Sequence, residues 1–177
     1  MAKKSLVVYY SATGTTRGVA QKIAKIIGAD VLEIELEESY SSADLNWTNE
    51  KSRVCVEHER IFEGRANGQA TADGMKKVLP ALKNEMPNFS DYDTVFIGYP
   101  IWWGVSAWPL SSFVMAADFD GASMIPFCTS MSSPLGRSDA LLKEIAGGKE
   151  NWMAGKRFGT RATESEVSAC LSEIGAR

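Results

Sequence analysis

Short, continuous apolar runs recur along this chain, and they constrain its fold more than any other feature. Three of them, SLVVYY (5–10), DTVFIGYP (93–100) and SMIPFCTS (123–130), are rich in branched and aromatic residues. Runs of this kind are typical of strands that are buried on both faces of a sheet. Two further strands are expected at 30–35 and within 150–158.

Helical segments lie between and after these runs. Apolar residues recur at helical spacing over 19–27 and 138–146, and 109–117 opens with a proline, which suits the first turn of a helix. The last helix begins with a capping box of Thr163 and Glu166. When strands and helices alternate, right-handed crossovers return each strand beside the last. The sequence therefore predicts an α/β fold, a parallel sheet with helices on both faces.

The chain is expected to form a single domain over 1–177, because this length suits one hydrophobic core. The connection at about 37–91 departs from the pattern, since it is polar, contains several glycines and has only a short helical pattern near Pro80–Met86. Loops this long inside compact domains are usually functional or partly disordered.

Charge and hydropathy argue against two classes of partner. The formal net charge is -3 and no basic stripe occurs, so nucleic acid is not an expected partner. No apolar run reaches the roughly 18 residues of a membrane-spanning helix. The N-terminal sequence MAKKSLVVYYS is expected to form the first strand rather than a signal peptide, which predicts a cytoplasmic location.

The cysteines and the single histidine predict no metal site and no catalytic group. Cys55, Cys128 and Cys170 are far apart and lack CxxC spacing, which argues against a disulfide framework or a zinc site. Cys128 and Cys170 are expected to be buried without a chemical role. His58 is expected to be a solvated loop residue, because its flanks give no supporting spacing for a metal or a catalytic triad.

Small and hydroxylated residues follow the first strand and precede a helix. They are Ser11, Ala12, Thr13, Gly14, Thr15 and Thr16. A helix N-terminus offers free amides and about half a positive charge, and small residues let an anion approach the backbone. The nucleotide fingerprints GxxxxGK[ST] and GxGxxG are both absent. The stretch is therefore either a phosphate-binding loop without a lysine or a structural turn.

Two adjacent tryptophans follow the strand at 93–100. They lie in a predicted loop formed by Pro100, Ile101, Trp102, Trp103 and Gly104. Such residues either fold back into the core or present a flat face to a ring, and stacking on an aromatic ring contributes about 1–3 kcal/mol. A third loop, CTSMSSPLG (128–136), adds hydroxyls and amides at the same edge of the sheet. Together the three loops indicate a phosphorylated aromatic cofactor.

These motifs resemble those of the flavodoxin family. SATGTT matches the hydroxyl-x-Thr-Gly-x-Thr pattern, and GYPIWWG followed by IPFCTS is similar to a bacterial flavodoxin-like group with an "NW…SR…E" segment. That segment is Asn46, Trp47, Ser52, Arg53 and Glu57 here. The resemblance covers nearly the whole chain and implies a five-stranded sheet of order 2-1-3-4-5 that binds FMN.

The resemblance also implies roles for individual residues. The phosphate would be held by Ser11, Thr13, Gly14 and Thr16, the flavin ring would be lined by Pro100 to Gly104, and its other edge would be approached by Thr129, Ser130 and Met131.

The sequence departs from the family pattern at two places. Met131 and Ser132 replace the paired glycines that would permit positive φ and close approach to the ring. Residues 60–90 are longer than usual, with EGRANGQATADG inserted as a surface loop, a lid or a docking segment.

The sequence is compatible with three functions. The first is an FMN electron carrier of flavodoxin type that serves redox partner proteins, with the redox chemistry belonging to the flavin. The second is an FMN-dependent oxidoreductase that passes hydride from NAD(P)H to a quinone or similar acceptor. The mild net charge favours it, because dedicated flavodoxins tend to be strongly acidic. The third, a flavin-free signalling domain, is disfavoured by the intact loops, and the fold alone does not choose among them.

Overall fold

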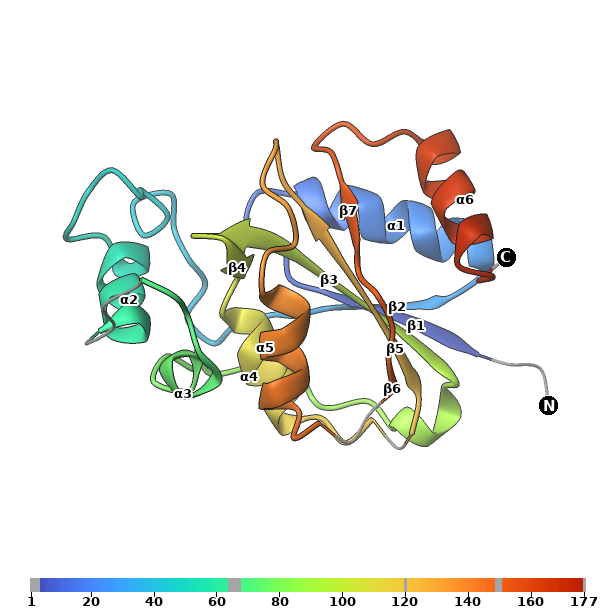
Figure 1. Ribbon diagram of the computed structural model, residues 1–177, viewed down its shortest axis with the longest axis horizontal. Helices are drawn as coiled ribbons and strands as arrows, with labels where there is room; N and C mark the ends of the chain where they lie inside the picture. The colour runs from blue at the N-terminus through green and yellow to red at the C-terminus, as the bar shows by residue number, and fades with distance from the viewer. Residues whose placement is uncertain (1–3, 64–67, 120, 149–150, 177) are drawn as a thin grey trace.

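The computed structural model describes residues 4–63, 68–119, 121–148 and 151–176. A parallel sheet forms its centre (Figure 1). The strands are β1 (Ser5–Tyr9), β2 (Asp30–Glu33), β3 (Thr94–Trp102), β4 (Val105–Ser106), β5 (Ser123–Thr129), β6 (Asn151–Trp152) and β7 (Lys156–Phe158). The helices are α1 (Thr15–Ile27), α2 (Arg53–Phe62), α3 (Ala72–Met75), η1 (Phe89–Asp91, a 3-10 turn), α4 (Pro109–Ala116), α5 (Ser138–Ile145) and α6 (Glu164–Glu173).

The strand order along the sheet is β2-β1-β3-β5-β6. β7 also pairs with β5 in parallel, so β6 and β7 share the fifth position as two short pieces of one edge. The predicted order 2-1-3-4-5 is therefore confirmed, with β5 as the fourth strand. Because the strands are parallel, the loops that follow β1, β3 and β5 emerge at one edge of the sheet.

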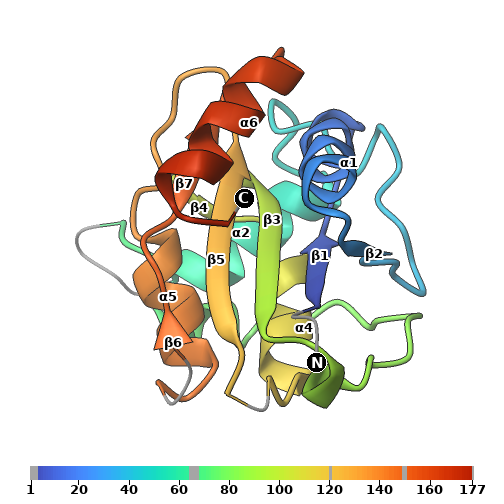
Figure 2. The ribbon, with the colours of Figure 1, turned by 90° about the vertical axis from the view of Figure 1, so that its right-hand side faces the viewer.

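Helices cover both faces of the sheet. α1 and α6 lie on one face, and α4 and α5 lie on the other (Figure 2). Successive side chains of β1 serve opposite faces: Val7 packs with the α1 and α6 layer, whereas Val8 packs with the α4 and α5 layer. This double burial explains why the strand sequences are continuously apolar.

One close approach in the centre of the sheet depends on a glycine. Gly98 of β3 is paired with Phe127 of β5, and a Cβ at Gly98 would lie 2.2 Å from an atom of the Phe127 ring. Phe127 is itself almost fully buried. Its ring therefore occupies the space that a side chain at Gly98 would need.

The predicted end of the first helix and the predicted start of the last helix agree with the structure. Gly28 closes α1 with a φ of 66°. At α6, the Thr163 side chain accepts a hydrogen bond from the Glu166 amide at 3.2 Å, and the Glu166 carboxylate accepts one from the Thr163 amide at 2.7 Å. The predicted capping box is confirmed.

The connection at 37–91 is not irregular throughout. It contains α2, which begins after an N-cap formed by Ser52, and the short helix α3. The helical pattern predicted near Pro80–Met86 is wrong, because Leu82 forms an antiparallel bridge with Leu36 beyond the end of β2. The backbone groups of this segment bond to the chain after β2 rather than to a helix of their own. Part of the expected insertion, 64–67, lies outside the described residues.

The cysteines are free thiols in the structure. Cys128 is buried as expected, and this burial raises the pKa of its thiol to about 12. Cys170 is only partly buried, so the expectation of burial holds only in part. Within the described ranges, no helix is long and apolar enough to cross a membrane, and no group of three or more potential metal ligands occurs.

Candidate functional site

The three loops expected to bind a ligand lie together at the carboxyl edge of the sheet. The Thr16 and Thr129 hydroxyls are 2.8 Å apart and form a buried hydrogen bond between the first and third loops. Gly136 of the third loop has a φ of 60°, and a Cβ there would lie 2.3 Å from the carbonyl oxygen of Gly104. The third loop therefore contacts the second through backbone atoms, and all three loops form one surface.

The first loop is folded around the Ser11 hydroxyl. Its oxygen accepts hydrogen bonds from the amides of Gly14 at 3.1 Å and Arg17 at 3.2 Å. Gly14 precedes α1 with a φ of 90°, a backbone conformation that other residues rarely adopt. Thr13 is exposed whereas Thr16 is buried, so their hydroxyls face different surroundings. The amides of Thr15 and Thr16, at the start of α1, have no partners within the helix and are available to an anion.

Arg17 lies beside this loop but is already paired. Its guanidinium donates to both carboxylate oxygens of Glu33, at 3.0 and 2.5 Å. Tyr9 donates to the same carboxylate at 2.9 Å, and burial together with this hydrogen bond raises the pKa of Tyr9 to about 12. An anion in the first loop would therefore depend mainly on amides and hydroxyls.

The tryptophan loop is a β-hairpin rather than an open loop. Trp102 is the last residue of β3 and pairs with Val105 of β4, so only Trp103 and Gly104 form the turn. Their φ angles are 47° and 79°, both positive as a two-residue type I′ turn requires. In the described part of the chain, Trp103 is the one non-glycine residue with a positive φ. Strain of this kind is often found at ligand-binding sites.

The two tryptophans have different surroundings. The Trp102 ring meets Tyr10, Tyr40 and Trp108 edge-to-face, with centroids 5.8, 5.3 and 4.8 Å away. Trp103 is 39% exposed and is stacked near-parallel to His58 at 4.5 Å and to Trp108 at 5.8 Å. Trp102 is therefore held by rings on several sides, and Trp103 retains more contact with solvent.

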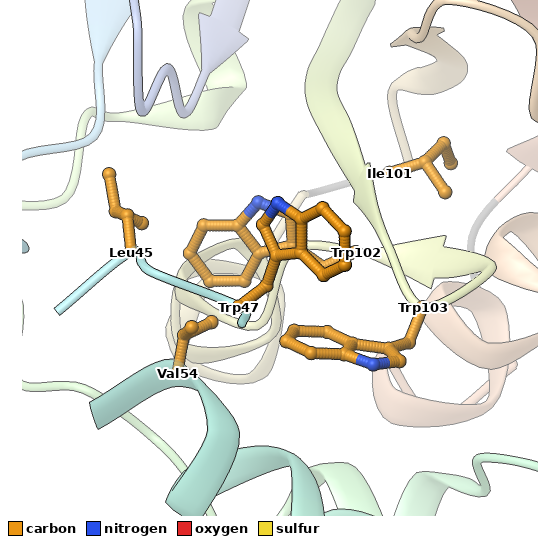
Figure 3. Close-up of a pocket in the computed structure, with 6 residues that line it drawn as sticks. All are labelled: Leu45, Trp47, Val54, Ile101, Trp102 and Trp103. Carbon is orange, nitrogen blue, oxygen red and sulfur yellow. The ribbon is translucent and has the colours of Figure 1, made fainter. Parts of the chain in front are cut away.

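An apolar pocket of about 270 Å³ opens beside the hairpin (Figure 3). It is lined by Leu45, Trp47, Val54, Ile101, Trp102 and Trp103. Trp47 is 73% exposed, so a large apolar surface faces solvent here. None of these six side chains carries a charge, so the pocket suits an uncharged, flat group.

The prediction for His58 is wrong. His58 lies on α2, not in a loop, and its ring packs between Trp103 and Phe62, the latter at 4.4 Å. Burial lowers the pKa of His58, although the nearby Glu59 charge opposes this shift. The prediction failed because it did not include α2, the helix on which the His58 ring packs against Phe62 and Trp103.

The third loop is fastened by an arginine that the sequence patterns did not indicate. Arg157 of β7 donates to the Ser130 hydroxyl at 3.0 Å and to the Met131 carbonyl at 2.7 Å. The Ser130 hydroxyl donates in turn to the Ser133 carbonyl. Met131 is 87% exposed, and neither Met131 nor Ser132 has a positive φ. The loop therefore keeps its shape without the paired glycines of the family.

The segment from Asn46 to Glu57, to which the resemblance assigned no individual roles, helps to form the apolar pocket and α2. Trp47 lines the apolar pocket, Ser52 caps α2, and Arg53 forms an ion pair of 2.9 Å with Glu57. Further residues around the hairpin were missed at the sequence level: Tyr10, Tyr40, Leu45, Val54 and Trp108. The i,i+4 spacing of Arg53 and Glu57 was the available signal for a helix here.

Comparisons with known proteins agree with this architecture. A candidate flavoprotein from Bacteroides eggerthii is 35% identical, with a TM-score of 0.81 and coverage of 98% of this chain and 99% of that one. One from Bacteroides uniformis is 31% identical, with a TM-score of 0.82 and coverage of 97% and 99%. A flavoprotein from Lactobacillus acidophilus, solved in complex with FMN, shares the fold at 19% identity and a TM-score of 0.69, with coverage of 99% and 100%.

A search of curated proteins found no match. A family model described as flavodoxin matches residues 4–174, the same span over which the strand order, the hydroxylated loop and the tryptophan hairpin were described. The chain belongs to the flavodoxin family.

Proposed function

We propose that this protein binds FMN at the three loops and serves as a flavodoxin-type electron carrier. The observation that carries the proposal is the meeting of the loops, through the Thr16–Thr129 hydrogen bond and the contact of Gly136 with Gly104. One flavodoxin-like domain spanning 1–177 is part of this proposal, and its cofactor-binding residues are those of the loops 11–16, 100–104 and 129–131.

The chemistry of the first loop fits a phosphate. It provides the hydroxyls of Thr13 and Thr15, and its backbone leads directly into the N-terminus of α1. No carboxylate belongs to the loop, and Glu33, which pairs with Arg17 beside the loop, is also bonded to Tyr9. A phosphate would therefore meet donors in a loop that carries no negative charge of its own.

The chemistry of the second loop fits an aromatic ring. The hairpin presents two indoles beside an uncharged pocket, and the third loop brings Ser130 and the exposed Met131 to the same edge of the sheet. The Thr129 hydroxyl is bonded to Thr16 and the Ser130 hydroxyl to Ser133, so the two hydroxyls would position the loop rather than meet the ring. A bound FMN would supply one- and two-electron redox chemistry. The protein's own residues would hold the phosphate, fix the ring and limit its contact with water.

A carrier is favoured over an enzyme because the loops offer no group with an evident acid or base role. His58, the one histidine of the chain, is packed between two aromatic rings. One observation favours the second candidate, an FMN-dependent NAD(P)H oxidoreductase: the exposed faces of Trp47 and Trp103 beside the proposed ring site could meet a flat, uncharged acceptor such as a quinone.

FMN binding is the first expected outcome. Purified protein, or apoprotein mixed with FMN, should show flavin absorption and a flavin fluorescence that nearby tryptophan quenches. A fluorescence titration measures both the affinity and the quenching. Absence of binding at high micromolar FMN would contradict the proposal.

Turnover separates the two candidate functions. A carrier should oxidise NADH or NADPH, with menadione as acceptor, far more slowly than the typical enzyme range of about 1–1000 per second. It should still accept electrons readily from a flavodoxin reductase. The measurement is steady-state nicotinamide oxidation with and without the reductase. Rapid, saturable turnover without reductase would instead establish the oxidoreductase.

A further inference from the structure

A buried carboxylate lies behind the tryptophan hairpin. Glu57 of α2 is only 8% exposed. One of its oxygens accepts hydrogen bonds from the Trp108 indole N–H at 2.8 Å and from the Tyr40 hydroxyl at 2.5 Å. The other oxygen accepts from Arg53 Nε at 2.9 Å. Three donors from three segments of the chain therefore converge on one side chain.

The two neutral donors are also the rings that hold Trp102. Tyr40 and Trp108 meet the Trp102 ring edge-to-face, at 5.3 and 4.8 Å. Because both donate to the same Glu57 oxygen, their positions relative to one another are fixed. Trp102 lies against this pair and forms one wall of the apolar pocket (Figure 3).

Arg53 reinforces the arrangement from the outer side. Its guanidinium carbon lies 4.0 Å above the centre of the Tyr40 ring, and its Nη1 donates to the Glu38 carbonyl at 2.8 Å. Burial and the hydrogen bond to Glu57 raise the pKa of Tyr40, so its hydroxyl remains a donor. Each polar group of the cluster has a partner, as buried polar networks require.

We propose that Glu57 is a positioning residue for the aromatic wall of the cofactor site. It acts through Tyr40 and Trp108, which set the orientation of Trp102. The inference rests on the proposed function, because it assigns the wall to the flavin ring. Buried ion pairs seldom stabilise a fold more than apolar residues of similar size would, whereas they can fix one arrangement among several.

Two variants test separately the charge and the length of the Glu57 side chain. Glu57→Gln keeps the length but removes the charge, and Glu57→Asp keeps the charge but shortens the side chain by one methylene. Glu166→Gln is the matched control, since Glu166 also accepts hydrogen bonds but caps α6, outside this cluster. Each variant is titrated with FMN and with riboflavin, and the near-UV circular dichroism of each apoprotein is recorded.

Both Glu57 variants should weaken FMN and riboflavin by the same factor, because the effect acts on the ring that the two ligands share. The expected factor is roughly 5- to 150-fold, the equivalent of one stacking contact. Both should change the tryptophan near-UV signal while the far-UV signal remains, and Glu166→Gln should change neither affinity nor near-UV signal.

Unchanged near-UV signal and affinity in both Glu57 variants would overturn the inference, as would weakening of FMN alone. Loss of the far-UV signal at the assay temperature would also overturn it, because Glu57 would then be needed for folding. If the wild-type protein bound neither flavin, the proposed function would fail. The near-UV comparison would still decide whether Glu57 orients the tryptophans.

Discussion

Replacing Gly98 by alanine is expected to lower the free energy of unfolding by about 1–3 kcal/mol, the usual effect of overpacking a core. The new methyl group would lie 2.2 Å from the Phe127 ring. That ring cannot turn aside easily, because Phe127 is buried and packs against Phe158 with centroids 6.1 Å apart. Urea denaturation of the purified variant measures the loss.

Gly18→Ala is the matched control, because it makes the same chemical change in α1. A Cβ at Gly18 would meet only the Lys22 ammonium at 4.0 Å, and its backbone is helical. Alanine is preferred to glycine inside a helix by roughly 0.5–1 kcal/mol, so this variant should be more stable than the wild type. Equal stability of the two variants would show that Phe127 relaxes freely and that the contact at Gly98 is not a packing constraint.

The central strands and the flanking helices could be predicted because their signals are local. Residues 6–10 and 124–128 are apolar without a break, as burial on two faces requires. The capping box at Thr163 is likewise defined within four residues. Such features need no knowledge of distant parts of the chain.

α2 was missed although Val54 and Ile61 lie on one helical face, because a glutamate interrupts the apolar residues of that face. Its buried residues are Val54, Glu57 and Ile61. The position of Glu57 becomes intelligible only when Trp108, distant in sequence, supplies an indole N–H at 2.8 Å. The same tertiary origin explains the error at His58, whose aromatic partner Trp103 comes from the hairpin after β3.

The candidate site was predictable as a set of loops, but their mutual contacts were not. Chain order places 11–16, 100–104 and 128–136 at one sheet edge. It does not reveal that Thr16 bonds to Thr129, or that Arg157 holds the carbonyl of Met131. These contacts decide which hydroxyls stay free to bind a ligand.

Thr13→Ala is expected to weaken FMN binding by about 1.5–3 kcal/mol, the range for a hydrogen bond to a charged group. Thr13 is exposed at the first loop, so its hydroxyl is free to donate to a phosphate. Riboflavin lacks the phosphate and should bind the variant as well as the wild type. Fluorescence titrations with the two flavins measure the difference, and Thr160→Ala, at another exposed threonine, is the control.

Thr16→Val should behave differently, because the Thr16 hydroxyl is buried in the bond to Thr129. Valine keeps the shape of threonine but breaks the link between the first and third loops. Since the third loop is proposed to border the ring, riboflavin and FMN should both bind more weakly. If Thr13→Ala weakens FMN alone, the Thr13 hydroxyl contacts the phosphate. If Thr16→Val weakens both flavins, the Thr16 hydroxyl holds the first and third loops together. If Thr13→Ala weakened the two flavins equally, the first loop would be a structural turn rather than a phosphate site.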